Sequence, residues 1–239
     1  EKISRFIRKN INKFDAIIID EGQDFGPEFW APLIDLLRDE VNSYLYIFYD
    51  SNQKIYQRDL KFPIREEPYC LTKNCRNTLE IHNASYRYYE GEPVDPPIEN
   101  TGLPVSTIPA EKLHDQALAL TRHVTYILCK ENISSEKIIV LIADNYYKER
   151  YYIELKKVEN LLPKGYKWAI ESFGLPKTIT VDTVQRFKGL EATIVYLWGI
   201  DDLDPYRDKE AIYVGLSRPK DILYLVGKEG VGNRLLVFL

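Results

Sequence analysis

The 239-residue sequence contains no methionine and only three cysteines and three histidines. Cys70, Cys75 and Cys129 form no CxxC pair and are odd in number, which argues against a disulfide framework and against a structural zinc site. The histidines have no nucleophile at a recognisable spacing, so none of them is assigned a catalytic role. The lack of methionine, with Glu1 as the first residue, indicates an excerpt from a longer protein.

Long hydrophobic runs are also lacking. Apolar runs such as residues 138–143 and 16–19 fall far short of the roughly 18 residues that a transmembrane helix requires. The first residues lead into no apolar segment of the kind found in a secretory signal. These absences predict a cytoplasmic protein that has no membrane partner.

A large excess of one charge is missing as well. The formal net charge is −4, because residues 1–66 hold 10 basic and 12 acidic side chains and the remainder holds 22 and 24. Neither part attracts polyanions through its overall charge. A nucleic acid would therefore bind in a local groove rather than on a uniformly basic surface.

Hydrophobic residues make up 45% of the chain and charged residues 28%, which is typical of a folded globular protein. Short apolar runs alternate with amphipathic stretches along most of the chain. The runs predict strands at 14–20, 44–49, 69–72, 138–142, 179–182, 194–198 and 222–226. The stretches predict helices starting near Pro27 and Thr78 and others over 113–128, 147–161 and 210–217, with a linker at 62–68. This alternation predicts an α/β fold of parallel sheets flanked by helices, with sites at the carboxyl ends of the strands.

Two adjacent carboxylates, Asp20 and Glu21, follow the first predicted strand. One such acid can hold a hydrated magnesium ion while its neighbour polarises an attacking water, as phosphoryl transfer requires. A solvated acidic loop is the alternative. Gln53 follows the second predicted strand, where a neutral amide would contact a terminal phosphate; a polar turn is the alternative there.

Five segments occur in the order of the motifs of UvrD/Rep-type superfamily 1 helicases. They are IDEGQD at 19–24, DSNQKIY at 50–56, LTKNCRNT at 71–78, TVQRFKGLE at 183–191 and YVGLSR at 213–218. The chain resembles this family from about residue 14 to residue 227. The resemblance implies a RecA-like P-loop NTPase fold. Residues 1–66 would form the C-terminal part of a first RecA-like domain, and residues 67–239 a nearly complete second one.

The resemblance also implies roles for individual residues. Asp20 resembles the magnesium ligand and Glu21 the general base for water, while Gln53 resembles the glutamine that contacts the γ-phosphate. Arg76 and Arg218 resemble arginine fingers, whose guanidinium groups stabilise the transferring phosphoryl group. A surface ion pair is the alternative for each arginine.

The remaining implied contacts involve the nucleotide ribose and the nucleic acid. Glu191 resembles the acid that contacts the ribose, and Thr183 and Gln185 occupy positions that approach DNA phosphates or the nucleotide. Tyr56 resembles an aromatic residue on which a base of single-stranded DNA stacks, a contact worth roughly 1–3 kcal/mol; with 18 tyrosines in the chain, ordinary packing is the alternative. ATP and Mg²⁺ are thus the implied cofactors, and single-stranded or partly duplex DNA is the implied partner.

The Walker A sequence GxxxxGK[ST] occurs nowhere in the chain. Relatives carry it upstream of the acidic motif, so a missing N-terminal half is the further partner that the resemblance implies. The sequence therefore predicts the C-terminal fragment of an ATP-dependent superfamily 1 DNA helicase or single-strand DNA translocase, with ATP hydrolysed between two RecA-like domains. Such a fragment would be inactive as an ATPase on its own. A catalytically inactive helicase-like scaffold or nucleic-acid-binding module is the alternative.

Overall fold

The computed structural model describes residues 13–39, 41–50, 62–64 and 66–237. The chain divides into two compact units, Glu1–Cys70 and Leu71–Leu239. The predicted site residues Gln53 and Tyr56 lie outside the described residues. Among the helices that are described, each is too short or too polar to cross a membrane.

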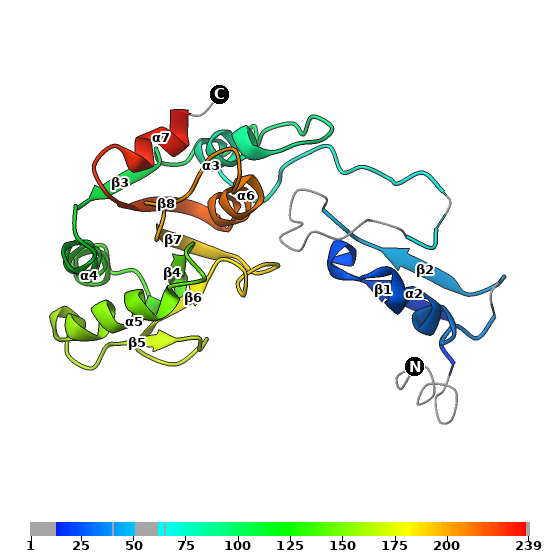
Figure 1. The fold of residues 1–239 in the computed structure, drawn as a ribbon, viewed down its shortest axis with the longest axis horizontal. Helices are drawn as coiled ribbons and strands as arrows, with labels where there is room; N and C mark the ends of the chain where they lie inside the picture. The colour runs from blue at the N-terminus through cyan, green and yellow to red at the C-terminus, as the bar shows by residue number, and fades with distance from the viewer. Residues whose placement is uncertain (1–12, 40, 51–61, 65, 238–239) are drawn as a thin grey trace. The chain divides into compact units, whose positions relative to one another are not determined.

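The elements follow one another along the chain as labelled in Figure 1. The first unit contains β1 (Ala16–Ile19), η1 (Gly22–Asp24), α2 (Pro27–Ile34) and β2 (Tyr44–Ile47). The second unit contains α3 (Leu79–Ser85), η3 (Tyr86–Tyr88), β3 (Ser106–Pro109), α4 (Leu113–Cys129), η4 (Ser135–Lys137), β4 (Ile138–Ile142), α5 (Lys148–Lys157), η5 (Glu159–Leu161), β5 (Lys167–Ile170), β6 (Thr178–Thr183), β7 (Ala192–Trp198), α6 (Lys209–Ser217), β8 (Pro219–Gly227) and α7 (Val231–Val237).

The first unit is built from a strand, a helix and a second strand. β1 pairs in parallel with β2, from Ala16 opposite Tyr44 to Ile19 opposite Ile47. Between them, α2 begins with Pro27 in its first turn, a position where the missing N–H of proline costs no hydrogen bond. The predicted strands at 14–20 and 44–49 and the helix from Pro27 are thereby confirmed.

The two faces of this small sheet differ in exposure. Ile19 is buried, whereas Ile18 on the other face is 69% exposed. Tyr44 and Tyr46 share the exposed face, with 61% and 51% of their surface accessible, and their rings stack at 6.2 Å. Parallel sheets are normally covered on both faces. Within the described residues, this face of the first unit therefore lacks the cover that such a sheet usually has.

The second unit is organised around a six-stranded sheet with the order β3-β8-β7-β4-β6-β5. Every strand pair in it is parallel. β4 lies inside the sheet and is buried at all five positions, which is why its sequence is a continuous run of branched and aliphatic residues. Because parallel neighbours need crossover connections, the helices lie on the faces of the sheet.

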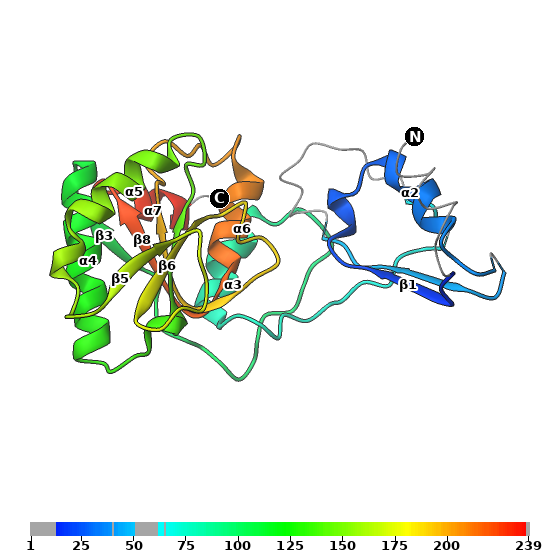
Figure 2. The ribbon, with the colours of Figure 1, turned by 90° about the horizontal axis from the view of Figure 1, so that it is seen from below.

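Helices cover both faces of the sheet (Figure 2). α4 and α5 lie on one face, where the Tyr151 ring meets the Trp198 ring edge-on at 4.8 Å. α3 and α6 lie on the other, and a Cβ added to Gly215 of α6 would come within 2.9 Å of Leu197 Cδ1. Consecutive residues of β7 thus pack against helices on opposite faces. The predicted α/β fold, with a parallel sheet flanked by helices, is confirmed.

The predicted strand at residues 69–72 is wrong. Tyr69 and Leu71 are 92% and 78% exposed, none of residues 69–72 belongs to a strand, and the neighbouring Lys73 forms an isolated bridge with Asp95. Among the residues that the structure describes, these side chains pack on no sheet face, so an apolar pattern alone does not make a strand here. β3, β5 and α7 were not predicted, because the first two are four-residue edge strands and α7 is a seven-residue helix.

Candidate functional site

The acidic loop of the first unit (residues 20–24) follows β1 directly. Glu21 adopts a left-handed backbone conformation with φ 53°, which is unusual for a residue that is not glycine. The Asp20 carboxylate accepts a hydrogen bond from the Glu21 N–H at 2.9 Å and is exposed. Strained residues of this kind cluster at functional sites, where the surrounding structure holds them in place.

Gln23 holds the acidic loop in place. Its side chain is fully buried, its Nε2 donates to the Glu21 carboxylate at 2.5 Å, and its Oε1 accepts from the Asp50 N–H at 3.1 Å. The side chain therefore links the loop after β1 to Asp50, three residues beyond the end of β2. Gln23 was not among the predicted site residues, although it lies inside the acidic motif.

Gly22 allows the loop to approach β2 closely. Its N–H donates to the Phe48 carbonyl at 2.8 Å, and a Cβ at this position would lie 2.4 Å from Ile47 Cγ2. Any other residue would push the loop away from β2. The Asp20 and Glu21 carboxylates are thus held at the carboxyl end of a two-stranded parallel sheet.

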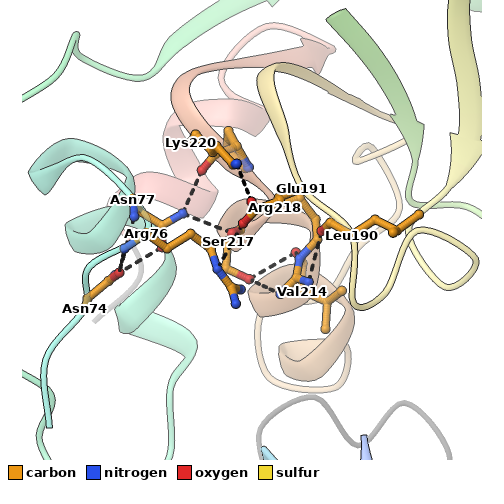
Figure 3. Close-up of polar contacts among 10 residues, drawn as sticks. Asn74, Arg76, Asn77, Leu190, Glu191, Val214, Ser217, Arg218 and Lys220 are labelled. Carbon is orange, nitrogen blue, oxygen red and sulfur yellow. Dashed lines mark hydrogen bonds and ion pairs between the residues drawn. The ribbon is translucent and has the colours of Figure 1, made fainter. Parts of the chain in front are cut away.

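The second unit contains an arginine cluster, which we define as Arg76, Asn77, Glu191, Arg218 and Lys220 (Figure 3). Glu191 is its acidic member. One carboxylate oxygen lies 3.3 Å from Arg76 Nε, and the other forms an ion pair with Lys220 Nζ. The three side chains are each between 37% and 49% exposed. Segments far apart in the sequence therefore meet at one carboxylate, and Lys220 is a member that the sequence analysis missed.

Arg218 has a different environment from Arg76. It is only 1% exposed, and its Nε donates to the Val214 carbonyl at 3.0 Å. Its Nη1 donates to the Leu190 carbonyl at 3.3 Å and its Nη2 to Ser217 Oγ at 3.0 Å. The guanidinium thus joins the end of α6 to the loop that carries Glu191.

The predicted DNA-contacting residues lie where β6 ends. Thr183 is buried, and its Oγ1 accepts from the Arg186 N–H at 3.3 Å. Asp182 next to it is also buried, forms a 3.1 Å ion pair with Arg186, and has its pKa raised by that burial. Among the described residues, Gln185 Oε1 is buried without a hydrogen-bond partner. Residues 183–191 therefore connect the two predicted DNA-contacting residues to the arginine cluster within one loop.

Comparison with protein families matches part of the second unit. Residues 178–226 match the family model of the UvrD-like helicase C-terminal domain. The chain is similar to the C-terminal portion of a UvrD-like helicase. A search of curated proteins found no significant match. Among solved structures, a protein described as the C-terminal domain of a possible DNA helicase from Lactobacillus plantarum WCFS1 aligns with 17% identity and a TM-score of 0.47, covering 64% of this chain and 86% of that one.

The part that matches the UvrD-like helicase domain contains β6, β7, α6 and nearly all of β8. Four of the predicted site residues fall within it: Thr183, Gln185, Glu191 and Arg218. Arg76 lies outside the match, yet the fold brings it to Glu191. Asp20 and Glu21 of the first unit also lie outside the matched residues.

A magnesium ion fits the acidic loop only if waters and phosphates supply most of its ligands. Within the described residues, no group of three or more acidic, histidine or cysteine side chains could hold a metal. Mg²⁺ typically binds through one or two carboxylates together with waters and substrate phosphates. The exposed Asp20 carboxylate at the end of β1 suits that mode of binding.

Proposed function

We propose that this chain is the C-terminal part of an ATP-dependent superfamily 1 DNA helicase or single-strand DNA translocase, which hydrolyses ATP between two RecA-like domains. The arginine cluster is the observation that carries the proposal. Positions 76, 191, 218 and 220 come from three distant segments, and they meet around the carboxylate of Glu191 and the carbonyl of Leu190. A surface ion pair would need only two of these residues.

The acidic loop supplies the hydrolytic groups in this proposal. Glu21 accepts a proton from the attacking water, and the hydrogen bond from Gln23 fixes its carboxylate in one orientation. Asp20 would hold Mg²⁺, which when bound neutralises charge on the phosphates. Gln53 would contact the γ-phosphate.

The two arginines serve the phosphates in different ways. Arg76 is 49% exposed, so its guanidinium can turn from Glu191 to a phosphate without leaving water. Arg218 donates to backbone carbonyls, and it would reach a phosphate by exchanging one of these bonds. Release of Arg76 leaves Glu191 paired with Lys220, and in this state the carboxylate would accept from the ribose.

The loop of residues 183–191 supports coupling to DNA. Thr183 and Gln185 would contact the phosphates of a single strand, and Tyr56 would stack on a base. Glu191 ends the same loop. A bound DNA strand that displaces Gln185 would therefore also displace Glu191, which holds Arg76 in an ion pair. Nucleic-acid binding would thereby change the arginine cluster.

The exposed face of the first unit supports the proposal that a further N-terminal segment packs against it. Ile18, Tyr44 and Tyr46 on β1 and β2 form an apolar surface of the kind that a neighbouring layer covers in a parallel sheet. We assign that cover to the segment carrying the phosphate-binding loop. The rest of the first RecA-like domain would then complete the ATP site.

The experiment measures ATP hydrolysis, with and without single-stranded DNA, by a protein that carries this sequence together with a phosphate-binding loop. Glu21→Gln should lower kcat by about two to four orders of magnitude, the usual contribution of a general base. Glu28→Gln removes an exposed carboxylate from the first turn of α2 and should leave the rate within about twofold. Equal rates in both variants would contradict the proposal and favour the inactive scaffold or nucleic-acid-binding module.

A further inference from the structure

Asn77 donates both of its side-chain amide protons to the residues on either side of Arg218. It is only 6% exposed, and its Nδ2 donates to the Ser217 carbonyl at 3.0 Å and to the Pro219 carbonyl at 2.6 Å (Figure 3). Its Oδ1 accepts from Asn74 Nδ2 at 3.0 Å. Both amide protons are therefore bound to the residues that immediately precede and follow Arg218.

The neighbours of Asn77 extend this junction. The Thr78 N–H donates to the Lys220 carbonyl at 3.1 Å. On the other side, Asn74 Oδ1 accepts from the N–H groups of Arg76 at 3.0 Å and of Asn77 at 3.3 Å, which closes a tight turn around Arg76. Hydrogen bonds thus connect the turn that carries Arg76 to the junction that carries Arg218.

The end of α6 explains why such a residue is needed. The last carbonyls of a helix have no partner within it, and a buried end requires donors from elsewhere. α6 ends at Ser217, and Pro219, two residues later, has no N–H to offer. Arg218 Nε caps Val214, and Asn77 Nδ2 caps Ser217. The cation at the helix C-terminus is also favoured by the helix dipole.

We infer that Asn77 is a positioning residue that fixes the backbone on both sides of Arg218 and joins Arg218 to Arg76. This inference rests on the proposed function. When either arginine contacts the nucleotide, the hydrogen bonds of Asn77 transmit its displacement to the other arginine. Asn77 itself touches neither phosphate nor water in this role. It acts through the carbonyls of Ser217 and Pro219.

The test follows the Arg218 Nε–H group by NMR in the ¹⁵N-labelled 239-residue chain, with the resonance assigned through its loss in Arg218→Lys. In the native chain this buried, hydrogen-bonded proton should exchange slowly with water. Asn77→Ala should speed its exchange by about tenfold or more. Asn77→Ser, which retains one donor, should give a smaller increase, and it decides the question if Asn77→Ala does not fold.

Gln116→Ala is the matched control. Gln116 is another buried amide of the same unit, and its Nε2 donates to the Ala110 carbonyl at 2.9 Å and to Asp201 at 2.8 Å. Its loss should destabilise the unit without changing Arg218 exchange. Unchanged exchange in the folded Asn77 variants, or an equal increase in Gln116→Ala, would overturn the inference. The measurement needs no nucleotide, so it stands even if a protein carrying this chain fails to hydrolyse ATP.

Discussion

At the scale of single residues, burial separates two arginines that the sequence motifs treat alike. Arg218 is 1% exposed and donates to carbonyls and a hydroxyl, whereas Arg76 lies in a half-exposed ion pair with Glu191. Removal of a buried guanidinium leaves several hydrogen-bond acceptors without donors. An exposed pair contributes little, because water screens its charges.

This difference predicts unequal costs of truncation. Arg218→Ala should lower the free energy of unfolding of the second unit by about 2–4 kcal/mol, because carbonyls of Val214 and Leu190 lose their donor in a buried site. Arg76→Ala should cost less than about 1 kcal/mol. Urea unfolding followed by circular dichroism measures both. Equal losses in the two variants would contradict this account of the cluster.

Individual site residues were partly predictable from sequence. The motifs located Arg76, Glu191 and Arg218, and the fold brings them together. Asn77 and Lys220 were missed, because their contacts are made across the fold and have no short sequence pattern. The roles of all the predicted site residues stay predictions: Asp20, Glu21, Gln53, Tyr56, Arg76, Thr183, Gln185, Glu191 and Arg218.

At the scale of elements, α3 joins the arginine cluster to a buried histidine. Its N-cap Thr78 follows Asn77 directly. One turn later, the His82 ring stacks on Tyr86 at 3.9 Å and its Nδ1 lies 3.0 Å from Asn74 Nδ2. This contact requires an unprotonated Nδ1 that accepts the amide hydrogen. Burial lowers the pKa of His82 and, in α4, the pKa of His123, whose Nδ1 lies 2.8 Å from the Tyr196 hydroxyl.

These lowered pKa values predict acid sensitivity. The unfolded chain takes up protons near pH 6.5, whereas the folded chain resists them until the pH is lower. Stability should therefore be complete above pH 6.5 and fall below it, by up to about 1.4 kcal/mol per pH unit for each histidine. Urea unfolding of the second unit at pH 7.5 and 5.5 tests this, with His82→Gln and His123→Gln each reducing the loss. A loss that persists undiminished in the double variant would assign it to other groups.

Most elements of the second unit were predictable because they are long or fully buried. The continuous apolar run of β4 and the amphipathic pattern of α4 predicted both elements closely. The edge strands β3 and β5 were missed, since their four residues are paired on one side only and carry a weak pattern. Strand pairing there is decided by β8 and β6, far away in the sequence.

At the scale of the whole molecule, the two units differ in how well their sheets are covered. The second unit has a six-stranded sheet with helices on both faces, whereas the described sheet of the first has two strands. A two-stranded sheet is marginal without further packing. Two units with such different cores are expected to open independently.

Hydrogen exchange of the 239-residue chain tests this expectation. Amides of β4 and β7 should exchange at least about a hundredfold more slowly than those of β1 and β2, because they open only with the whole second unit. Adding the segment with the phosphate-binding loop should slow β1 and β2 and leave β4 unchanged. Equal protection of all four strands in the chain alone would contradict this account of two independent units.

The proposed action of the arginine cluster on a nucleotide is tested most directly by DNA-stimulated ATP hydrolysis, measured on a protein that carries this sequence with a phosphate-binding loop. Arg76→Ala should lower kcat by about a hundredfold or more, since arginine fingers contribute that much or more to phosphoryl transfer. Arg87→Ala, which removes an exposed arginine of η3, should change kcat by less than about twofold. An Arg76→Ala protein that hydrolyses ATP as fast as the Arg87→Ala protein would contradict the account.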